Sequence, residues 1–359
     1  MERRCSSSLQ LLLLRHPFFV AAAISLLVSA FLITTTAAAA AGSGRQGLMG
    51  LNYGMKGDNL PTPPEVISLC KSKNITRLRL FDPDPAALAA LENSGIHVIL
   101  GCYNDDLPNF AADPSSAVAW VDANVVPYAA ALNFTYIDIG NEVIPGELAA
   151  FVLPAMRNID AALRSAGISV PVTTAVSTAV LGTSYPPSQG AFTEQASQVM
   201  GPIISFLAST NAPLLANVYP YFAYADNPEE IRLDYALFAT SDIVVQDGSL
   251  GYSNLFDAMV DSVSSAVERL GGAGVRVVVS ETGWPSAGGG NASTVDNARA
   301  YNNNLIRHVN EKTGTPKCPG NDLEVYTFAL FNENLKPEGT ERNFGMFYPN
   351  MTEVYHVEF

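Results

Sequence analysis

The stretch "VVVSETGWPSAGG" (277–289) places a glutamate, Glu281, directly after a run of β-branched residues. Such a run is typical of a strand that is buried on both faces of a parallel sheet. The glycine- and proline-rich residues that follow it indicate a turn. A charge directly after a buried strand is an unusual placement, which makes Glu281 a candidate functional residue.

Seven further apolar runs share this character, and helical patterns separate them. Eight strands that alternate with helices predict a (β/α)₈ barrel, with a doubly wound open sheet as the alternative. Eight units within residues 42–359 favour the barrel. About fifty residues separate the sixth and seventh runs and predict a small inserted subdomain that contains "VVQDGSLGY" (244–252). The other runs are "LMGLNYG" (48–54), "ITRLRLFD" (75–82), "HVILGC" (97–102), "FTYIDIGNE" (134–142), "VPVTTAVS" (170–177), "PLLANVYPY" (213–221) and "EVYTFALFNE" (324–333), and the helical patterns include 84–95, 117–132, 155–167 and 255–272.

Residues 1–41 are predicted to be a secretory signal peptide. Arg3 and Arg4 give a positive start, and an apolar run over 18–41 ends in small residues of the kind that precede cleavage. The alternative is a membrane anchor, because the run is long enough to span a bilayer. The alanine-rich end favours the signal, so we expect one folded domain over residues 42–359.

The chain is strongly acidic. Its formal net charge is −14, and cleavage after residue 41 would remove three arginines and one glutamate and bring it to −16. This charge argues against nucleic acid and anionic membranes as partners. Cys70, Cys102 and Cys318 remain after cleavage, and their odd number predicts small packed thiols rather than a disulfide scaffold. The scattered histidines suggest no zinc site, so we expect neither a metal nor a cofactor.

Four N-x-S/T sequons are glycosylation candidates in a secreted chain. We expect the one that stands just before a strand, Asn133, to be poorly accessible. The other three are Asn74, Asn291 and Asn350.

Three of the predicted strands end in a glutamate: Glu142, Glu281 and Glu333. Active sites of such barrels lie at the carboxyl ends of the strands, so these side chains should meet there. Two facing carboxylates suit glycosidic bond cleavage, one as the acid and one as the nucleophile or base; ion pairs at the barrel rim are the alternative. Aromatic residues near strand exits are candidates for stacking on sugar rings, with ordinary core packing as the alternative: Tyr53, Tyr219, Tyr221, Phe222, Trp284 and Phe331.

Other catalytic motifs fail their context. "GSGRQG" (42–47) fits a dinucleotide-binding pattern, but it follows the predicted signal and precedes a strand. No nucleophile elbow and no phosphate-binding loop is present in the sequence.

The quoted stretch closely resembles the signature of plant β-1,3-glucanases, glycoside hydrolase family 17. Further matches in order include "LRLFDPD", "YIDIGNEV", "NVYPYFAY", "YTFALFNENLKP" and "ERNFGMFYPN", and they span nearly the whole chain after the signal. The resemblance implies a (β/α)₈ barrel and retaining, endo-acting hydrolysis of β-1,3-glucan.

The resemblance also implies roles for individual residues. Glu142 in "GNEV" would be the proton donor and later the base, and Glu281 in "SETGWP" the nucleophile. Asn141 would bind the sugar 2-hydroxyl, and Tyr219 would orient the nucleophile. Glu333 and Lys336 in "NENLK" would support the site electrostatically, with Lys336 also keeping Glu281 ionised.

The sequence departs from the family pattern in two places. Asp58 in "GDNLP" stands where the family pattern has asparagine, and the sequence ends soon after the last strand. We therefore expect secretion to the cell wall or apoplast rather than the vacuole, a monomer, and β-glucan polysaccharide as the partner. The alternatives are a β-1,3;1,4-glucan hydrolase on the same fold and a non-hydrolytic glucan-binding protein, with transglycosylation as a third outcome.

Overall fold

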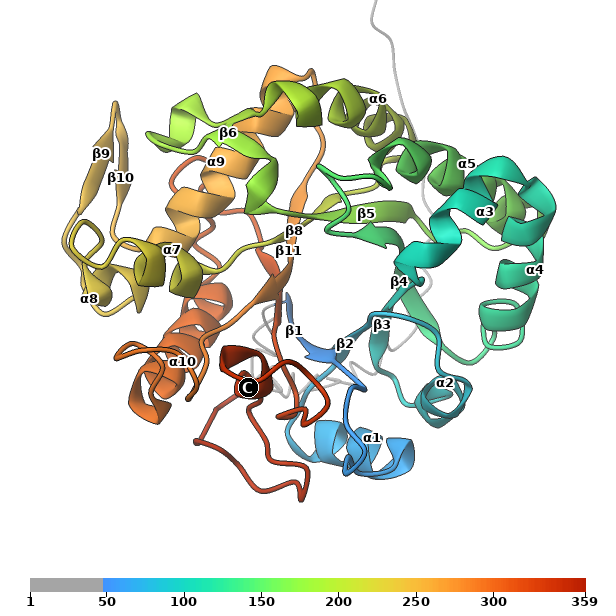
Figure 1. Cartoon of the computed structure of the whole chain (residues 1–359), viewed down its shortest axis with the longest axis horizontal. Coiled ribbons are helices and arrows are strands. Elements are labelled where there is room, and N and C mark those ends of the chain that lie inside the picture. Colours follow the sequence, from blue (N-terminus) through green and yellow to red (C-terminus); the bar gives the residue numbers. More distant parts are fainter. Residues whose placement is uncertain (1–47) are drawn as a thin grey trace, which may run out of the picture. The chain divides into compact units, whose positions relative to one another are not determined.

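The computed structural model describes residues 48–359, so the predicted signal peptide and "GSGRQG" lie outside the described residues. Eight parallel strands form a closed barrel in the order β1-β12-β11-β8-β5-β4-β3-β2 (Figure 1). Each of the eight apolar runs supplies one strand, which confirms the (β/α)₈ barrel. The strands are β1 (Leu48–Tyr53), β2 (Arg77–Leu80), β3 (His97–Gly101), β4 (Asn133–Asn141), β5 (Val172–Ser177), β8 (Leu214–Asn217), β11 (Val277–Thr282) and β12 (Glu324–Thr327).

Helices surround the barrel strands (Figure 1). The side chain of the residue just before a helix fixes where several of them begin: Asp84 accepts a hydrogen bond from the Ala87 amide, and Thr193 from the Ala196 amide. The 117–132 pattern ends earlier than expected, at Asn124, ahead of Pro127, whose ring cannot continue a helix. These helices are α1 (Pro63–Ser72), α2 (Pro85–Leu91), α3 (Leu107–Ala112), α4 (Pro114–Asn124), α5 (Ala149–Ser165), α6 (Glu194–Thr210) and α10 (Val295–Glu311).

The predicted insertion lies between β8 and β11. It contains α7 (Pro220–Asp226), α8 (Leu233–Ala236), an antiparallel hairpin of β9 (Val245–Asp247) and β10 (Leu250–Tyr252), and α9 (Leu255–Arg269). Its own small apolar cluster consists of Tyr235, Tyr252 and Ala258. A second small hairpin, β6 (Leu181–Thr183) with β7 (Ala191–Phe192), follows β5 and was not expected from the sequence.

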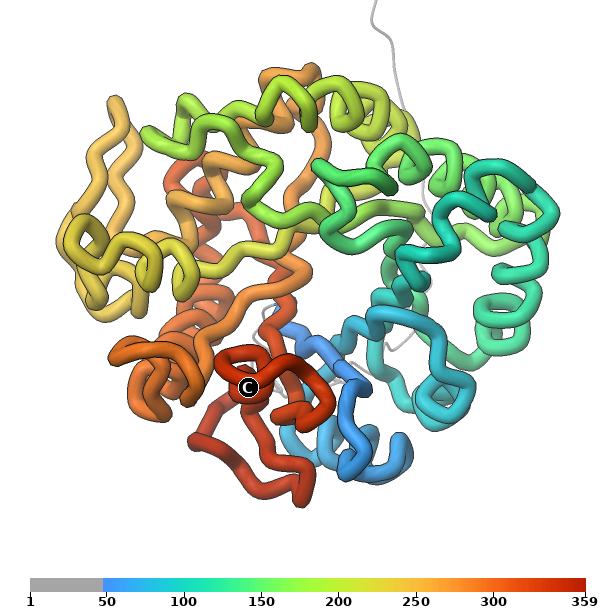
Figure 2. The backbone as a smooth tube through the Cα atoms, in the orientation of Figure 1, coloured from blue at the N-terminus to red at the C-terminus, as the bar shows by residue number. Residues whose placement is uncertain are grey.

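Strands β1 and β12 close the barrel, and the chain's blue and red ends lie side by side there (Figure 2). Gly50 allows this approach, because a Cβ at that position would lie 2.4 Å from the Tyr326 ring. One layer of buried side chains fills the interior near the amino ends of the strands, so the barrel is a packed core. That layer consists of Ile99, Tyr136, Ala175, Leu215, Val278 and Tyr326.

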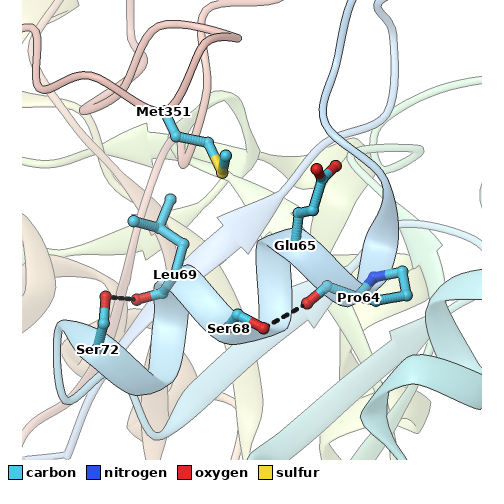
Figure 3. Close-up of a pocket in the computed structure, with 6 residues that line it drawn as sticks. All are labelled: Pro64, Glu65, Ser68, Leu69, Ser72 and Met351. Carbon is cyan, nitrogen blue, oxygen red and sulfur yellow. Dashed lines mark hydrogen bonds between the residues drawn. The ribbon is translucent and has the colours of Figure 1, made fainter.

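A shallow depression lies on the outer face of α1, where Leu69 and Met351 provide the apolar surface (Figure 3). The hydroxyls of Ser68 and Ser72 donate to the Pro64 and Leu69 carbonyls, each at 2.8 Å. Those hydroxyls are therefore satisfied by the helix itself and do not point to a ligand.

The cysteines behave largely as predicted. Cys70, Cys102 and Cys318 are all free thiols, the first two buried and the third partly exposed. Over residues 48–359, no helix combines the length and the apolar character needed to span a membrane.

Candidate active site

A cleft of about 980 Å³ opens at the carboxyl ends of the barrel strands. Loops that follow β1, β2, β3, β4, β5, β8 and β12 contribute to its walls. Of the residues expected from the sequence, those that line it are Asn141, Glu142, Tyr219, Phe222, Glu281, Glu333 and Lys336. The position of the cleft agrees with the general placement of active sites in this fold.

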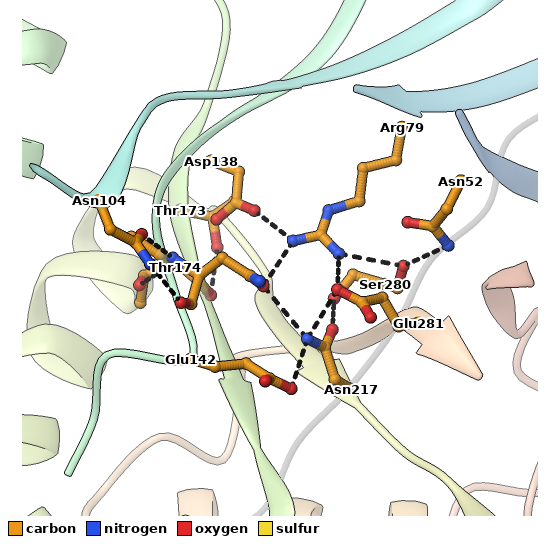
Figure 4. A network of polar contacts seen from close by, with 12 residues as sticks. Asn52, Arg79, Asn104, Asp138, Glu142, Thr173, Thr174, Asn217, Ser280 and Glu281 are labelled. Carbon is orange, nitrogen blue, oxygen red and sulfur yellow. Dashed lines mark hydrogen bonds and ion pairs between the residues drawn. The ribbon is translucent and has the colours of Figure 1, made fainter. Parts of the chain in front are cut away.

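Glu142 and Glu281 meet across one amide group (Figure 4). The Nδ2 of Asn217 donates to Oε1 of Glu142 and to Oε1 of Glu281, both at 2.9 Å. The two acceptor oxygens are therefore at most twice that distance apart, 5.8 Å. The Ser280 hydroxyl donates to Oδ1 of Asn217 at 2.7 Å, which fixes the amide so that its NH₂ faces the two carboxylates.

A buried arginine holds Glu281. Nη1 of Arg79 lies 2.6 Å from Oε1 of Glu281, and Nη2 donates to Asp138 and to Asn141, both at 2.8 Å. Burial disfavours the cation, but Asp138 and Glu281 outweigh burial and raise the pKa of Arg79 above its ordinary value. Arg79 is fully buried and stays charged.

The second oxygen of Glu281 accepts from the Tyr219 hydroxyl at 2.7 Å. Burial, together with the nearby Glu281 charge, raises the pKa of Tyr219 well above its usual range, so the phenol keeps its proton and donates it. Both oxygens of Glu281 thus accept hydrogen bonds, and the carboxylate is fixed in position.

Glu142 lies in a different environment. Its backbone adopts a left-handed conformation, with φ of 57°, and its amide donates to the Ala175 carbonyl at 2.9 Å. A non-glycine residue in this region is strained, and such strain gathers at functional sites. The side chain is open to the cleft, yet burial by the cleft walls, and then the charge of Glu281, raise the pKa of Glu142 above its ordinary value. Water in the open cleft moderates this rise, and a bound substrate would strengthen it.

Asn141 is held on two sides. Its Oδ1 accepts from Arg79 at 2.8 Å and from Asn217 at 3.1 Å, which leaves its NH₂ on the opposite side of the amide, free of these two partners. Asn104 brackets its backbone: the Asn141 amide donates to Oδ1 of Asn104, and Nδ2 of Asn104 donates to the Asn141 carbonyl, each at 2.9 Å. Asn141 therefore presents its donor from a rigid position.

Glu333 and Lys336 form the expected pair, with 3.7 Å between the carboxylate and ammonium groups. Glu333 also accepts from the Lys56 amide at 2.6 Å, and Gly54 leaves it room, since a Cβ there would lie 2.4 Å from its Oε2. The expectation that Lys336 keeps Glu281 ionised is corrected: the cation in contact with Glu281 is Arg79. Lys336 instead lies 4.1 Å above the Phe328 ring.

The aromatic candidates divide into two groups. Phe222, 40% exposed, and Tyr219 line the cleft. Direct sugar stacking is corrected to core packing for four others, which are at most 4% exposed and lie behind the cleft wall: Tyr53, Tyr221, Trp284 and Phe331. The Trp284 indole, for example, donates to the Ala292 carbonyl and its ring centroid lies 5.2 Å from that of Tyr221. Among the described residues Tyr103, which was not expected, is 54% exposed at the cleft.

Two further expectations concern the surface. All four sequon asparagines are exposed, so the poor accessibility expected for Asn133 is corrected. Asp58 lies outside the cleft lining, where its carboxylate accepts from Asn334 at 2.7 Å. That bond ties the loop after β1 to the loop after β12. Between residues 48 and 359, no group of three or more histidine, cysteine or acidic side chains is arranged to hold a metal.

Sequence reasoning missed Arg79, Asp138 and Asn217. Each lies within an apolar strand run, and the signal was available: a polar residue in a strand that is buried on both faces must point to a polar interior. These residues place a cation at Glu281, while the pKa of Glu142 is raised. One carboxylate can therefore attack a sugar while the other donates a proton to the same glycosidic bond.

Comparison with known proteins identifies relatives of this chain. The family model for glycosyl hydrolases family 17 matches residues 49–359. A putative glucan endo-1,3-β-glucosidase of Hordeum vulgare is 58% identical over 87% of this chain and 97% of its own length. Lichenase-2 of the same plant is 49% identical over 87% and 98%. The solved structure of a β-1,3-glucanase and allergen of Cryptomeria japonica pollen is 46% identical, with a TM-score of 0.84 over 87% of this chain and 99% of that one. The chain belongs to family 17 of the glycosyl hydrolases.

Proposed function

We propose that this protein cleaves internal bonds of β-1,3-glucan by retaining double displacement, with Glu142 as acid and base and Glu281 as nucleophile. The chain is a glycoside hydrolase of the glucan endo-1,3-β-glucosidase type, as its family and close relatives show.

One observation carries the mechanism. Carboxyl groups about 5–5.5 Å apart allow direct attack and retention, whereas about 6.5–9.5 Å is needed to admit a water and invert. The shared Asn217 donor limits the two oxygens to 5.8 Å or less. That limit lies below the separation that inversion requires and supports retention.

In the first step Glu142 gives its proton to the glycosidic oxygen while Glu281 attacks the anomeric carbon. The C–O bond to the leaving chain breaks, and a bond from Glu281 to the sugar forms. The raised pKa of Glu142 keeps the proton available. Arg79 and Tyr219 hold the attacking carboxylate in place.

In the second step Glu142, now ionised, removes a proton from water, whose oxygen attacks the same carbon. The bond to Glu281 breaks and the carboxylate returns to its hydrogen bonds with Arg79 and Tyr219. Asn141 presents its NH₂ beside the reacting centre, where a hydrogen bond to the sugar 2-hydroxyl would strengthen in the transition state.

The test is hydrolysis of laminarin by wild type, Glu281→Gln and Glu142→Gln. We expect both variants to lose activity by several orders of magnitude, and NMR of the first product to show the β-anomer. Near-normal activity of Glu281→Gln, or an α-anomer as the first product, would refute the mechanism.

A second candidate activity is hydrolysis of β-1,3;1,4-glucan, because lichenase-2 is 49% identical over most of both chains. Parallel assays on laminarin and barley-type mixed-linkage glucan separate the two. Binding of laminarin without release of reducing ends would instead indicate a non-hydrolytic protein. Products longer than the substrate would reveal transglycosylation.

The location is also a proposal. We propose that residues 1–41 direct secretion to the cell wall or apoplast, and that 42–359 act there as a monomeric, glycosylated domain. The exposed sequons at Asn74, Asn133, Asn291 and Asn350 are compatible with glycans. Sequencing the amino terminus of the protein recovered from the apoplast, with a mass before and after deglycosylation, tests this.

A further inference from the structure

A single guanidinium lies between two buried carboxylates inside the barrel. Arg79 on β2 contacts Asp138 on β4 at 2.8 Å and Glu281 on β11 at 2.6 Å (Figure 4). Arg79 is fully buried, and Asp138 is 2% exposed. With both carboxylates ionised, the three groups carry a net charge of −1, and little water is available to screen it.

Asp138 is not placed to touch substrate. It does not belong to the lining of the cleft, and its Oδ1 has no hydrogen-bond partner among the described residues. Its other oxygen, Oδ2, accepts a hydrogen bond from the nitrogen Nη2 of Arg79. The Ala175 backbone also interacts with this carboxylate, and Arg79 is the cation that links it to the cleft.

We propose that Asp138 is a positioning residue that limits how strongly Arg79 neutralises the nucleophile Glu281. The inference rests on the proposed function, in which Glu281 must be both an attacking group and a leaving group. A carboxylate paired alone with a buried guanidinium leaves readily but attacks poorly. By sharing the cation, Asp138 keeps negative charge on Glu281 for the attack.

The other titratable groups near Asp138 and Glu281 do not take over the proposed role of Asp138. Glu281 is faced by Glu142 and by the neutral phenol of Tyr219, and Glu341 adds a more distant negative charge near both of these. Asp138 is near the Cys102 thiol, whose pKa burial raises to about 12, so that neighbour is also neutral. Arg79 is therefore the cation that the two carboxylates compete for.

The experiment is Asp138→Asn, which keeps the size of the side chain and an acceptor for Arg79 but removes the charge. At an effective dielectric of about 20, a charge about 7 Å away shifts a titration by about 1–2 pH units. We expect the acidic limb of the kcat/KM profile on laminarin to move to lower pH by that amount. With a 2-deoxy-2-fluoro glycoside, we expect labelling of Glu281 to slow about tenfold or more and release of the label to quicken.

Matched variants separate charge from structure. Asp138→Glu keeps the charge and should keep the acidic limb of the wild type. Glu324→Gln removes another buried carboxylate that is paired with an arginine, at the opposite end of the barrel, and should leave both limbs in place. An acidic limb in Asp138→Asn that coincides with the wild type, or labelling and release slowed alike, would overturn the proposal.

Two results bear on other parts of the reasoning. If wild type is not labelled at Glu281, the proposed mechanism fails before the role of Asp138 is reached. If Asp138→Asn does not fold, Asp138→Ser is the second uncharged variant. Failure of both to fold while Asp138→Glu folds would mean that the carboxylate serves stability, and would overturn the positioning role.

Discussion

Replacing Arg79 by methionine tests the polar centre of the barrel most directly. Methionine fills much of the space of the arginine stem but makes none of its hydrogen bonds. The change leaves Asp138 and Glu281 without their cation and removes one of the two donors to Asn141. Because Asp138 is buried and lies outside the cleft lining, water cannot replace its lost partner without opening the barrel.

The cost follows from burial. Removing one partner of a buried ion pair typically costs about 3–5 kcal/mol of unfolding free energy, because the remaining charge is left uncompensated. For a folded domain of this size, about 4 kcal/mol corresponds to a fall in Tm of roughly 6 °C. In the variant the buried carboxylates would take up protons more readily in the folded state than when unfolded. The loss should therefore be small below about pH 4 and should grow as pH rises towards 7.

Urea unfolding at pH 4 and pH 7 measures this for wild type, Arg79→Met and the double variant Arg79→Met/Asp138→Asn. The double variant removes one of the two stranded charges, so it should recover part of the stability at pH 7 but not the activity. An Arg79→Met variant within about 1 kcal/mol of wild type at pH 7 would contradict the reasoning. So would a loss that is larger at pH 4 than at pH 7.

Three further changes test other parts of the site. Glu142→Gln should abolish the alkaline limb of the pH profile of kcat/KM, since the raised pKa of Glu142 places its loss of a proton on that side. Azide should restore turnover of an aryl glucoside with a good leaving group. Absence of this rescue would argue against the acid–base role. Phe222→Ala should raise KM for laminarin by about fivefold with little change in kcat, as the loss of one aromatic contact of about 1 kcal/mol implies; an unchanged KM would remove Phe222 from the glucan site. Trp284→Ala, at a fully buried position, should lower the unfolding free energy by about 3–5 kcal/mol, and a stable variant with weakened glucan binding would contradict core packing.

The sequence predicted the barrel because its strands are unusually explicit. Runs such as 275–283 are apolar on both faces, which only a covered parallel sheet accommodates, and each matched one strand of the closed barrel. Glu142 and Glu281 were identified because they come at strand exits, which a barrel gathers at one end. The sequence did not predict the lengths of those elements whose ends are set by tertiary contacts. The helix pattern over 117–132, which ended at Asn124, is an example.

The position of a residue near the end of a strand does not predict whether its side chain points into the cleft. Trp284 stands three residues after Glu281, yet it turns away from the cleft and packs against Tyr221 and Tyr301. Arg79 was missed for the converse reason. It lies in the middle of "LRLF", where alternation alone does not say which face of β2 looks into the barrel. The pairing of Arg79 with Ile99 in the sheet register settles it, because paired residues of parallel strands share a face.

Strand β2 carries two arginines on that inward face, and the proposed role of Asp138 accounts for the extra acid at the cleft end. At the amino end Arg77 pairs with Glu324 at 3.2 Å, and two neutral tyrosine hydroxyls complete the shell of that carboxylate. That pair is balanced and needs no further charge. At the carboxyl end a balanced pair would weaken Glu281 as a nucleophile, and in the proposed mechanism Glu281 has to donate electron density to a sugar carbon and take it back. In our proposal, Asp138 on the other side of Arg79 leaves the cation in position and weakens its interaction with Glu281. The same pairing of arginine with glutamate thus fills the amino end of the barrel and, in the proposed mechanism, positions a reacting group at the carboxyl end.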